Sequence, residues 1–296
     1  MRWLYIFLIF LVVIICILVI FSRRVDFLAE DVESFENPLE IKKDMMDKNY
    51  VAIYDKVFNE KEMYVVEAKV ILDFLKKKRQ KGYILDAGTG TGKHYMNLSA
   101  GGAKILGIER SDAMMDVFQK RNPMGRVEKG DLRNENLFGA QKFSVICCLK
   151  ETLYHNKVKD WDTILSNFYY WLKPGGYLIV HIFDREKLDP APRNFTFLRT
   201  DANGRKHGIT NFPNFTHDGW WEKRGNVICQ YNEIIALRDK KGKIIDKKHY
   251  KHNLVMPKRE KIVDKILKNY FKMVDMVKMD KYGIIDHDLC FFKKIK

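Results

Sequence analysis

Cysteine is scarce in this chain, with five cysteines among 296 residues. Small domains stapled by disulfides need a far higher density, so the sequence excludes a disulfide scaffold. The four cysteines beyond residue 16 lie in apolar, strand-like runs, which agrees with a reducing compartment. The chain also lacks internal repeats and low-complexity segments. Its hydrophobic fraction of 46% is sufficient for a packed core and excludes global disorder.

Acidic residues are too few to balance the basic ones. The chain has 53 Lys and Arg against 38 Asp and Glu, which gives a formal net charge of +15. The excess is uneven, because residues 239–296 hold 17 basic and 8 acidic residues whereas residues 1–40 have a net charge of −3. Anionic partners, nucleic acid among them, must therefore be weighed against a solvated basic face.

One long hydrophobic run is present, at the N-terminus. Residues 3–21 are 19 apolar residues without a charge, glycine or proline. At about 1.5 Å per residue a helix of this length spans roughly 28 Å, close to the thickness of a hydrocarbon core. A cleaved signal peptide usually has an apolar region of only about 7–15 residues and a small-residue cleavage site, whereas Ser22-Arg23-Arg24 follows here. The sequence therefore predicts a retained transmembrane anchor over residues 1–24.

The residues that flank this run indicate its orientation. Arg23 and Arg24 outnumber Arg2, which favours a cytosolic C-terminal side. Residues 25–42 are acidic, polar and aperiodic, and we interpret them as a tether. The expected protein is a single-pass membrane protein whose remaining domain, residues 43–296, faces the cytosol.

Strand-like and helix-like segments alternate through the middle of the chain. Strands are predicted at residues 83–86, 104–109, 126–131, 143–150 and 177–183. Helices are predicted at residues 43–58, 61–79, 92–99, 112–121 and 158–172. This alternation is typical of an α/β fold with a parallel sheet and helices on both faces.

The pattern changes after the fifth strand. Residues 185–256 contain short alternating runs separated by turn signals, which predict antiparallel hairpins. A helix is predicted at residues 257–271, followed by strands at 273–279 and 288–294.

A glycine-rich segment, Asp86-Ala-Gly-Thr-Gly-Thr-Gly-Lys-His94, follows the first predicted strand and begins a helix. Glycines at such a corner let the backbone turn tightly and approach a ligand closely. A phosphate-binding loop would need Ser or Thr in place of His94 to ligate Mg²⁺. A dinucleotide site would need the spacing G-x-G-x-x-G, whereas these glycines alternate at 88, 90 and 92. Both readings therefore fit less well than a third.

The third reading is a resemblance to class I S-adenosylmethionine-dependent methyltransferases, of the small-molecule type with a methyltransferase type 11/25-like domain. It rests on Asp86 with its three alternate glycines, and on Glu109 at the end of the next strand. Gly130-Asp131-Leu132 closes the third strand, and a Leu-Lys-Pro-Gly-Gly segment at 172–176 precedes the fifth. The resemblance covers residues 50–184 well and is looser over 185–296. It implies a Rossmann-like sheet of seven strands with an antiparallel insertion after strand 5.

The resemblance also implies S-adenosylmethionine as cofactor and roles for individual residues. The glycine loop would pass beside the amino acid moiety, Glu109 would accept hydrogen bonds from the ribose hydroxyls, and Asp131 from the adenine amino group. Arg110 and Leu132 would flank the ring, and Lys150 follows the fourth strand. The predicted cofactor residues are Asp86, Ala87, Gly88, Thr89, Gly90, Glu109, Arg110, Asp131, Leu132 and Lys150.

Methyl transfer from a sulfonium needs little acid–base assistance, so no catalytic triad is expected. Tyr154 and His155, after the fourth strand, are candidates for orienting or deprotonating the acceptor; the alternative is a structural loop. The sequence predicts no metal site.

The methyl acceptor is harder to predict. The resemblance implies that residues 185–256, which are rich in aromatics, shape its pocket. The fourth strand is followed by Leu149-Lys150-Glu151-Thr152 rather than by the N/D-P-P-Y/F motif of enzymes that methylate planar amino groups. The leading hypothesis is a membrane-anchored methyltransferase for a small-molecule or lipid-like acceptor. The alternatives are an RNA or protein methyltransferase that uses the basic 239–296 region, and a non-catalytic membrane-bound module.

Overall fold

The computed structural model describes residues 11, 13–15, 40–42, 47–189 and 195–295. Most of the predicted anchor and tether lies outside these residues. Leu11 and residues 13–15 of the anchor are helical, and in the described part of the chain no helix is both long and apolar enough to cross a membrane. The anchor therefore remains a prediction. The chain divides into two compact units, Met1–Glu40 and Ile41–Lys296, and apart from the first residue of β1, Glu40, the second contains the elements considered below.

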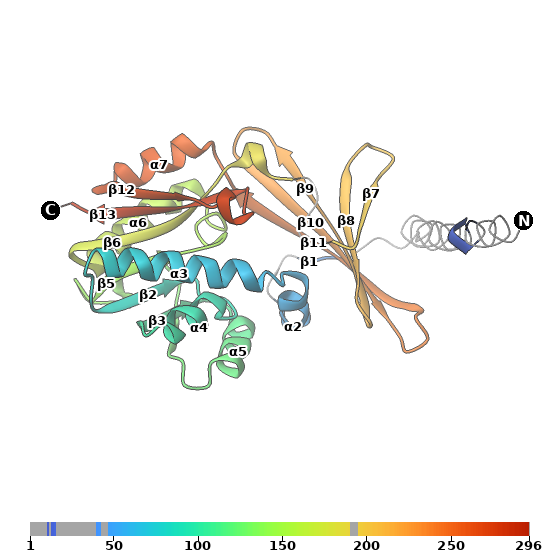
Figure 1. Cartoon of the computed structure of the whole chain (residues 1–296), viewed down its shortest axis with the longest axis horizontal. Helices are drawn as coiled ribbons and strands as arrows, with labels where there is room; N and C mark the ends of the chain where they lie inside the picture. Colours follow the sequence, from blue (N-terminus) through green and yellow to red (C-terminus); the bar gives the residue numbers. More distant parts are fainter. Residues whose placement is uncertain (1–10, 12, 16–39, 43–46, 190–194, 296) are drawn as a thin grey trace, which may run out of the picture. The chain divides into compact units, whose positions relative to one another are not determined.

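A seven-stranded sheet forms the centre of the larger unit (Figure 1). Its strand order is β12-β13-β6-β5-β2-β3-β4. The five strands from β4 to β6 run parallel, and β13 runs antiparallel to both β6 and β12. The bounds are β2 Tyr83–Ala87, β3 Lys104–Glu109, β4 Val127–Lys129, β5 Phe143–Cys148, β6 Leu172–Phe183, β12 Phe271–Lys278 and β13 His287–Lys294. The α/β fold with a seven-stranded sheet is thus confirmed.

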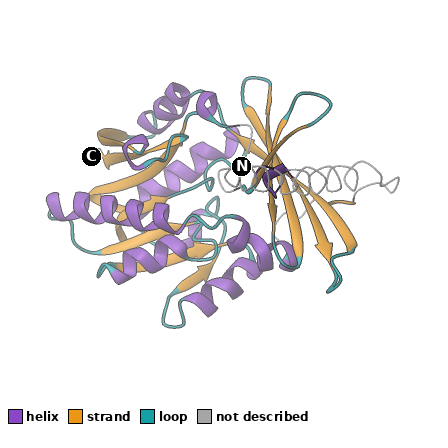
Figure 2. Cartoon of the chain, turned by 45° about the vertical axis from the view of Figure 1, so that its right-hand side comes forward, coloured by secondary structure: helices purple, strands orange, loops and turns teal. Residues whose placement is uncertain are grey.

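Helices cover both faces of this sheet (Figure 2). Because side chains alternate along a strand, neighbouring residues supply two separate cores. Ile84 and Val145 pack with the helices α3 (Lys61–Lys77), α4 (Lys93–Ala100) and α5 (Asp112–Arg121). Leu85 and Ile146 pack on the other face with α6 (Val158–Trp171) and α7 (Arg259–Leu267).

The predicted hairpins form a second, antiparallel sheet with the order β1-β11-β10-β9-β8-β7. Gly204, Gly225 and Gly242 have positive φ at three of its turns. The helix α2 (Lys48–Val57) packs against this sheet through Tyr50, which belongs to the same hydrophobic cluster as Phe215. The bounds are β1 Glu40–Lys42, β7 Phe197–Thr200, β8 Lys206–Asn211, β9 Phe215–Arg224, β10 Ile228–Arg238 and β11 Ile244–Val255.

Several element boundaries differ from the prediction for local reasons. The predicted turn at 173–176 is a bulge within β6, since Phe143 pairs with Leu172 and Val145 with Tyr177. The predicted helix 43–58 is described as helical only from Lys48, where the Asp47 side chain accepts a hydrogen bond from the Tyr50 amide. The strand predicted at 143–150 ends at Cys148.

The contact between Phe291 and Phe74 tests the core between α3 and the sheet. Phe291 of β13 is fully buried, and its ring stacks on Phe74 with 4.1 Å between ring centres. We expect Phe291→Ala to lower the free energy of unfolding by about 3–5 kcal/mol, because it leaves a cavity in a packed core. Tyr170→Ala, at a half-exposed position of α6, should change it by about 0.5 kcal/mol or less. Urea denaturation measures both, and equal losses would contradict the assigned packing.

Candidate active site

A cavity of about 140 Å³ opens at the carboxyl ends of β2, β3 and β5. In sheets of this kind ligands bind at this edge, where the strand order reverses. Here β2 lies between β3 and β5, so the reversal falls at the glycine loop. Most of the predicted cofactor residues line the cavity, namely Asp86, Gly88, Thr89, Gly90, Glu109, Arg110, Asp131, Leu132 and Lys150. Ala87 is fully buried in β2 and does not line it.

Two positions of the loop are glycine for different reasons. Gly88 has φ +73°, and a Cβ atom there would lie 2.4 Å from the Thr152 side chain. Gly90 has φ +56°, and a Cβ atom there would meet nothing within 4 Å. The backbone at Gly88 is therefore packed against the loop after β5, whereas at Gly90 it borders open space that a ligand can occupy.

Asp86 supports the loop from beneath. Its carboxylate is 2% exposed and accepts a hydrogen bond of 2.6 Å from the Thr89 hydroxyl. Burial raises the pKa of this carboxyl above its usual value. The residue thus fixes the first turn of the loop while lining the cavity.

Glu109 ties the loop to the neighbouring strand. Its Oε2 accepts from the Gly90 amide at 3.0 Å, and its Oε1 accepts from the amides of Arg110 and Ser111 at 2.9 Å. A carboxylate has about four lone-pair sites, so these three bonds leave room for a ligand hydroxyl. Glu109 is thereby held in place before any ligand binds.

Asp131 lies just beyond β4, and its carboxylate is paired with Arg133. Its Oδ1 accepts from the Arg133 amide and Nε at 2.9 Å. Hydrogen bonds from Arg133 hold the pKa of Asp131 below its usual range. The carboxylate is ionised at the cavity rim, and a ligand amino group would bind beside this ion pair.

The helix α2 is fastened over the glycine loop by one carboxylate. Asp55 accepts from the Thr91 hydroxyl at 2.9 Å, lies 3.1 Å from Lys93 Nζ and forms an ion pair with Arg121. Burial alone would raise the pKa of Asp55, but Arg121 and Lys93 hold it below its usual value. As a result Tyr54, in the same helix turn, forms part of the cavity wall.

A second cavity of about 160 Å³ lies between α2, the loop after β5 and the strands β9–β11. Four residues line both cavities: Tyr54, Lys150, Glu151 and His155. The two cavities therefore meet at a common wall. Of the aromatics in the insertion, Trp221 and Tyr231 line the second cavity, and their ring centres are 4.8 Å apart.

A buried carboxylate organises the far wall of this second cavity. Glu233 of β10 is fully buried, and its oxygens lie 2.5 Å from the Tyr50 hydroxyl, 2.9 Å from His217 Nε2 and 2.6 Å from His252 Nε2. Burial alone would raise its pKa, but hydrogen bonds from His217 and His252 bring it to about 2. Glu233 is therefore an anion that orients two imidazoles and a phenol lining the cavity.

The structure separates the two residues proposed for acceptor chemistry. Tyr154 is fully buried and lines neither cavity; its hydroxyl donates to the His181 carbonyl at 2.9 Å and accepts from the Phe183 amide at 3.0 Å. Its hydrogen bonds are structural. His155 lines both cavities, and burial, with His252 and Arg110 nearby, lowers its pKa to about 3. The imidazole is thus neutral and a weak base.

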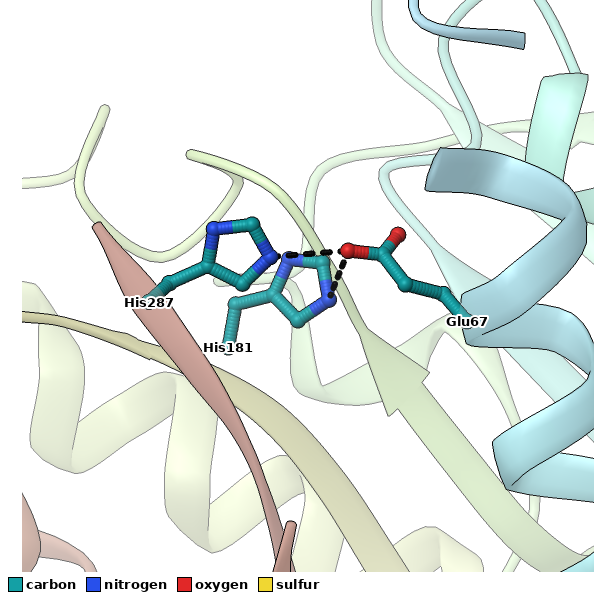
Figure 3. Close-up of side chains that lie close together, drawn as sticks. All are labelled: Glu67, His181 and His287. Carbon is teal, nitrogen blue, oxygen red and sulfur yellow. Dashed lines mark hydrogen bonds and ion pairs between the residues drawn. The ribbon is translucent and has the colours of Figure 1, made fainter. Parts of the chain in front are cut away.

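The common wall is held from behind by a buried cluster (Figure 3). Lys150 has φ +50°, and its amide donates to His181 Nδ1 at 2.8 Å. Glu67 of α3 projects toward His181 and His287, with its Oε1 3.4 Å from His181 Nε2 and 2.7 Å from His287 Nε2. Its Oε2 lies 2.6 Å from His94 Nε2.

Glu67, His181 and His287 also have ligand atoms within 4.8 Å of one another, as a metal site would. The hydrogen bonds favour a different assignment. Because His181 Nδ1 accepts a hydrogen bond from the Lys150 amide, Nε2 carries the proton of the neutral ring and has no lone pair for a metal. The close contact of His287 Nε2 with Glu67 is likewise that of a direct hydrogen bond.

The charge state of His287 makes stability depend on pH. Burial alone would lower its pKa, but hydrogen bonds to Asp286 and Glu67 raise it to about 9 from 6.5. The folded protein holds this proton more tightly, so the stabilisation is complete below pH 6.5 and is lost as pH rises through 9. We expect the free energy of unfolding of His287→Gln to fall less between pH 6.5 and 9 than that of the unchanged chain.

His249→Gln is the matched control for this prediction, because burial lowers the pKa of His249 to about 4. Its titration lies below the tested range, so this variant should keep the slope of the unchanged chain. Urea denaturation at stepped pH gives the slopes. The same slope for His287→Gln and the unchanged chain would show that Glu67 does not bind a charged His287.

Sequence analysis did not identify these buried networks. Glu67 lies on the buried face of α3 between Met63 and Ile71, and Glu233 lies in the buried stretch of β10. A carboxylate at a core position is rarely left unpaired, which is the one signal that points to them. The histidine partners come from distant strands that local sequence does not bring together.

Comparison with known proteins agrees with this geometry. A family model described as "Methyltransferase domain" matches residues 84–176. The chain is 30% identical over 135 residues to dTDP-4-amino-2,3,4,6-tetradeoxy-D-glucose N,N-dimethyltransferase of Saccharopolyspora spinosa, covering 45% of this chain and 53% of the relative. It is 26% identical over 162 residues to a ubiquinone biosynthesis O-methyltransferase of Coxiella burnetii, covering 53% and 63%. The chain thus spans about half the length of the first curated relatives it matches.

Solved structures resemble a larger part of the chain. CalS10, described as an amino pentose methyltransferase from Micromonospora echinaspora with SAM bound, superposes with a TM-score of 0.63 at 18% identity, covering 88% of this chain and all of CalS10. The sugar N-methyltransferase KedS8 from Streptoalloteichus sp. superposes with a TM-score of 0.65 at 14% identity, covering 89% and 100%. At these identities the likeness shows the fold.

Proposed function

We propose that this chain transfers a methyl group from S-adenosylmethionine to a small-molecule acceptor. Its residues 84–176 match a methyltransferase domain, and its fold is that of class I S-adenosylmethionine-dependent methyltransferases. The observation that carries this proposal is the pair of cavities with a common wall. One lies on the glycine loop and the other beneath the insertion, so two ligands would meet at Tyr54, Glu151 and His155.

The residues of the first cavity fit the cofactor. The open backbone at Gly90 can lie beside its amino acid moiety, Glu109 is oriented for the ribose hydroxyls, and Asp131 with Leu132 lies where the adenine would bind. The cofactor supplies a methyl group on a positively charged sulfur that a nucleophile can displace. The chain itself needs to hold the acceptor in line with the methyl group, and α2 and the insertion, which both line the second cavity, are placed to do so.

The second cavity supports a small acceptor over a macromolecule. Its volume of about 160 Å³, between α2, β9–β11 and the loop after β5, suits a ligand of small size. The names of two curated relatives describe dTDP-linked amino sugars, which are small molecules rather than macromolecules. Lipid-like acceptors remain within the proposal, since Leu188, Leu254 and Ile285 line one side of the cavity.

We further propose that residues 1–24 anchor the enzyme in a membrane with the methyltransferase domain in the cytosol. The support is the 19-residue apolar run and the arginine pair that follows it.

The first test of the function is cofactor binding. The full chain in detergent should bind S-adenosylmethionine and S-adenosylhomocysteine in a calorimeter. Glu109→Ala should weaken both by losing charge-assisted hydrogen bonds worth about 1.5–3 kcal/mol each. Glu128→Ala, an exposed carboxylate of β4, should leave both affinities unchanged.

Transfer itself is tested with radiolabelled cofactor against small-molecule fractions of cell extract, beginning with amino sugars. ATP–Mg²⁺ binding without S-adenosylmethionine binding would refute the proposed function. Since Glu109 also accepts three backbone amides, the unfolding curve of Glu109→Ala must be recorded beside its affinity.

The anchor is tested by extraction. The full chain should sediment with membranes and resist alkaline carbonate, because a 19-residue apolar helix is not released by salt or high pH. Replacing residues 3–21 by a polar linker should release the protein. Protease added outside sealed cytosol-out vesicles should digest the methyltransferase domain, and its full protection would overturn the proposed orientation.

A further inference from the structure

Glu151 stands out at the wall between the two cavities. It follows Lys150 in the loop after β5, is partly exposed and lines both cavities. Among the residues that the structure describes, none forms a hydrogen bond or ion pair with its carboxylate. A carboxylate that lines a cavity without a partner from the chain can accept hydrogen bonds from a ligand, and it favours a ligand with a positive charge or with N–H groups.

No charged side chain near Glu151, among the described residues, forms an ion pair with it. Lys150 forms its ion pair with Glu60, with 2.7 Å between Nζ and Oε2, and attracts Glu151 only at longer range, without an ion pair. His155 is neutral at physiological pH. Glu233, on the far wall of the second cavity, is paired with His217 and His252. Lys187 also lines the second cavity, but its side chain is half-exposed and lies 4.0 Å from Asp184. The junction therefore retains the negative charge of Glu151.

We propose that Glu151 binds the amino group of the methyl acceptor, which makes the second cavity a site for an amine. This inference rests on the proposed function. The acceptor enters as an ammonium paired with the carboxylate and loses one proton to water. The resulting amine still donates its N–H groups to the carboxylate, and its lone pair is then free to face the first cavity. Trp221 and Tyr231 supply aromatic faces against which the carbon skeleton of the amine would pack.

The carboxylate of Glu151 would also stabilise the charge that develops during methyl transfer. As the nitrogen lone pair bonds to the methyl carbon, the carbon–sulfur bond breaks and its electron pair stays on sulfur. Positive charge thus passes from sulfur to nitrogen, and the methylated ammonium later loses a proton to water. A carboxylate hydrogen-bonded to the nitrogen stabilises that charge more in the transition state than in the ground state.

The test uses a matched pair of probes, cyclohexylammonium and cyclohexanol, titrated by calorimetry into the full chain saturated with S-adenosylhomocysteine. We expect the ammonium to bind about tenfold more tightly than the alcohol, as one charge-assisted hydrogen bond allows. Glu151→Gln should abolish this preference, and Glu151→Asp should retain part of it. Glu135→Gln, an exposed carboxylate away from both cavities, should behave as the unchanged chain.

Two results would overturn the proposal. One is an equal affinity of the unchanged chain for the two probes, or a preference that survives in Glu151→Gln. The other is a Glu151→Gln variant that loses affinity for S-adenosylmethionine but keeps it for S-adenosylhomocysteine, because the carboxylate would then serve the sulfonium. Failure of the proposed function is distinguishable, since it appears as absent S-adenosylhomocysteine binding before either probe is added.

Discussion

The pairing of Glu67 with three histidines is the interaction on which the site depends. A carboxylate buried between a helix and a sheet is tolerated only when each oxygen is satisfied, and breaking such a network typically costs several kcal/mol. Here one residue of α3 holds His94 of α4 and His287 of β13 by hydrogen bonds, and its Oε1 lies 3.4 Å from Nε2 of His181 in β6. His181 in turn accepts the amide of Lys150, a residue with positive φ. The position of the wall between the cavities therefore follows from a charge that lines neither cavity.

The helix α2 plays the corresponding part on the opposite side. Asp55 fastens it to the glycine loop and α5, and Tyr50 fastens it to Glu233 of the insertion. Both attachments use a buried or half-buried carboxylate rather than apolar packing alone. The same helix thus lines both cavities, which share this one structural element.

Sequence reasoning predicted the sheet and the cofactor cavity because their signals are local. Each signal lies within a short segment. One is the strand, glycine loop and helix that meet at Asp86, and the other is the carboxylate of Glu109 at the end of the next strand. The second cavity had no such signal. Tyr50 and Glu233 are 183 residues apart, and Glu67 and His287 are 220 apart, so only the folded chain brings them together. Tyr154 illustrates the converse error, since a polar residue beside a predicted site proved to satisfy buried backbone groups of β6.

The ion pairs of Asp55 have a consequence for ionic strength. Arg121 and Asp55 are each about one-fifth exposed, so dissolved salt reaches them and weakens their attraction, whereas the Glu67 cluster lies beyond its reach. Concentrated salt should loosen α2 from the glycine loop while leaving the backbone of Lys150, which is held by the buried His181, in place. Affinities for two ligands that share α2 can therefore be compared only when they are measured in the same buffer.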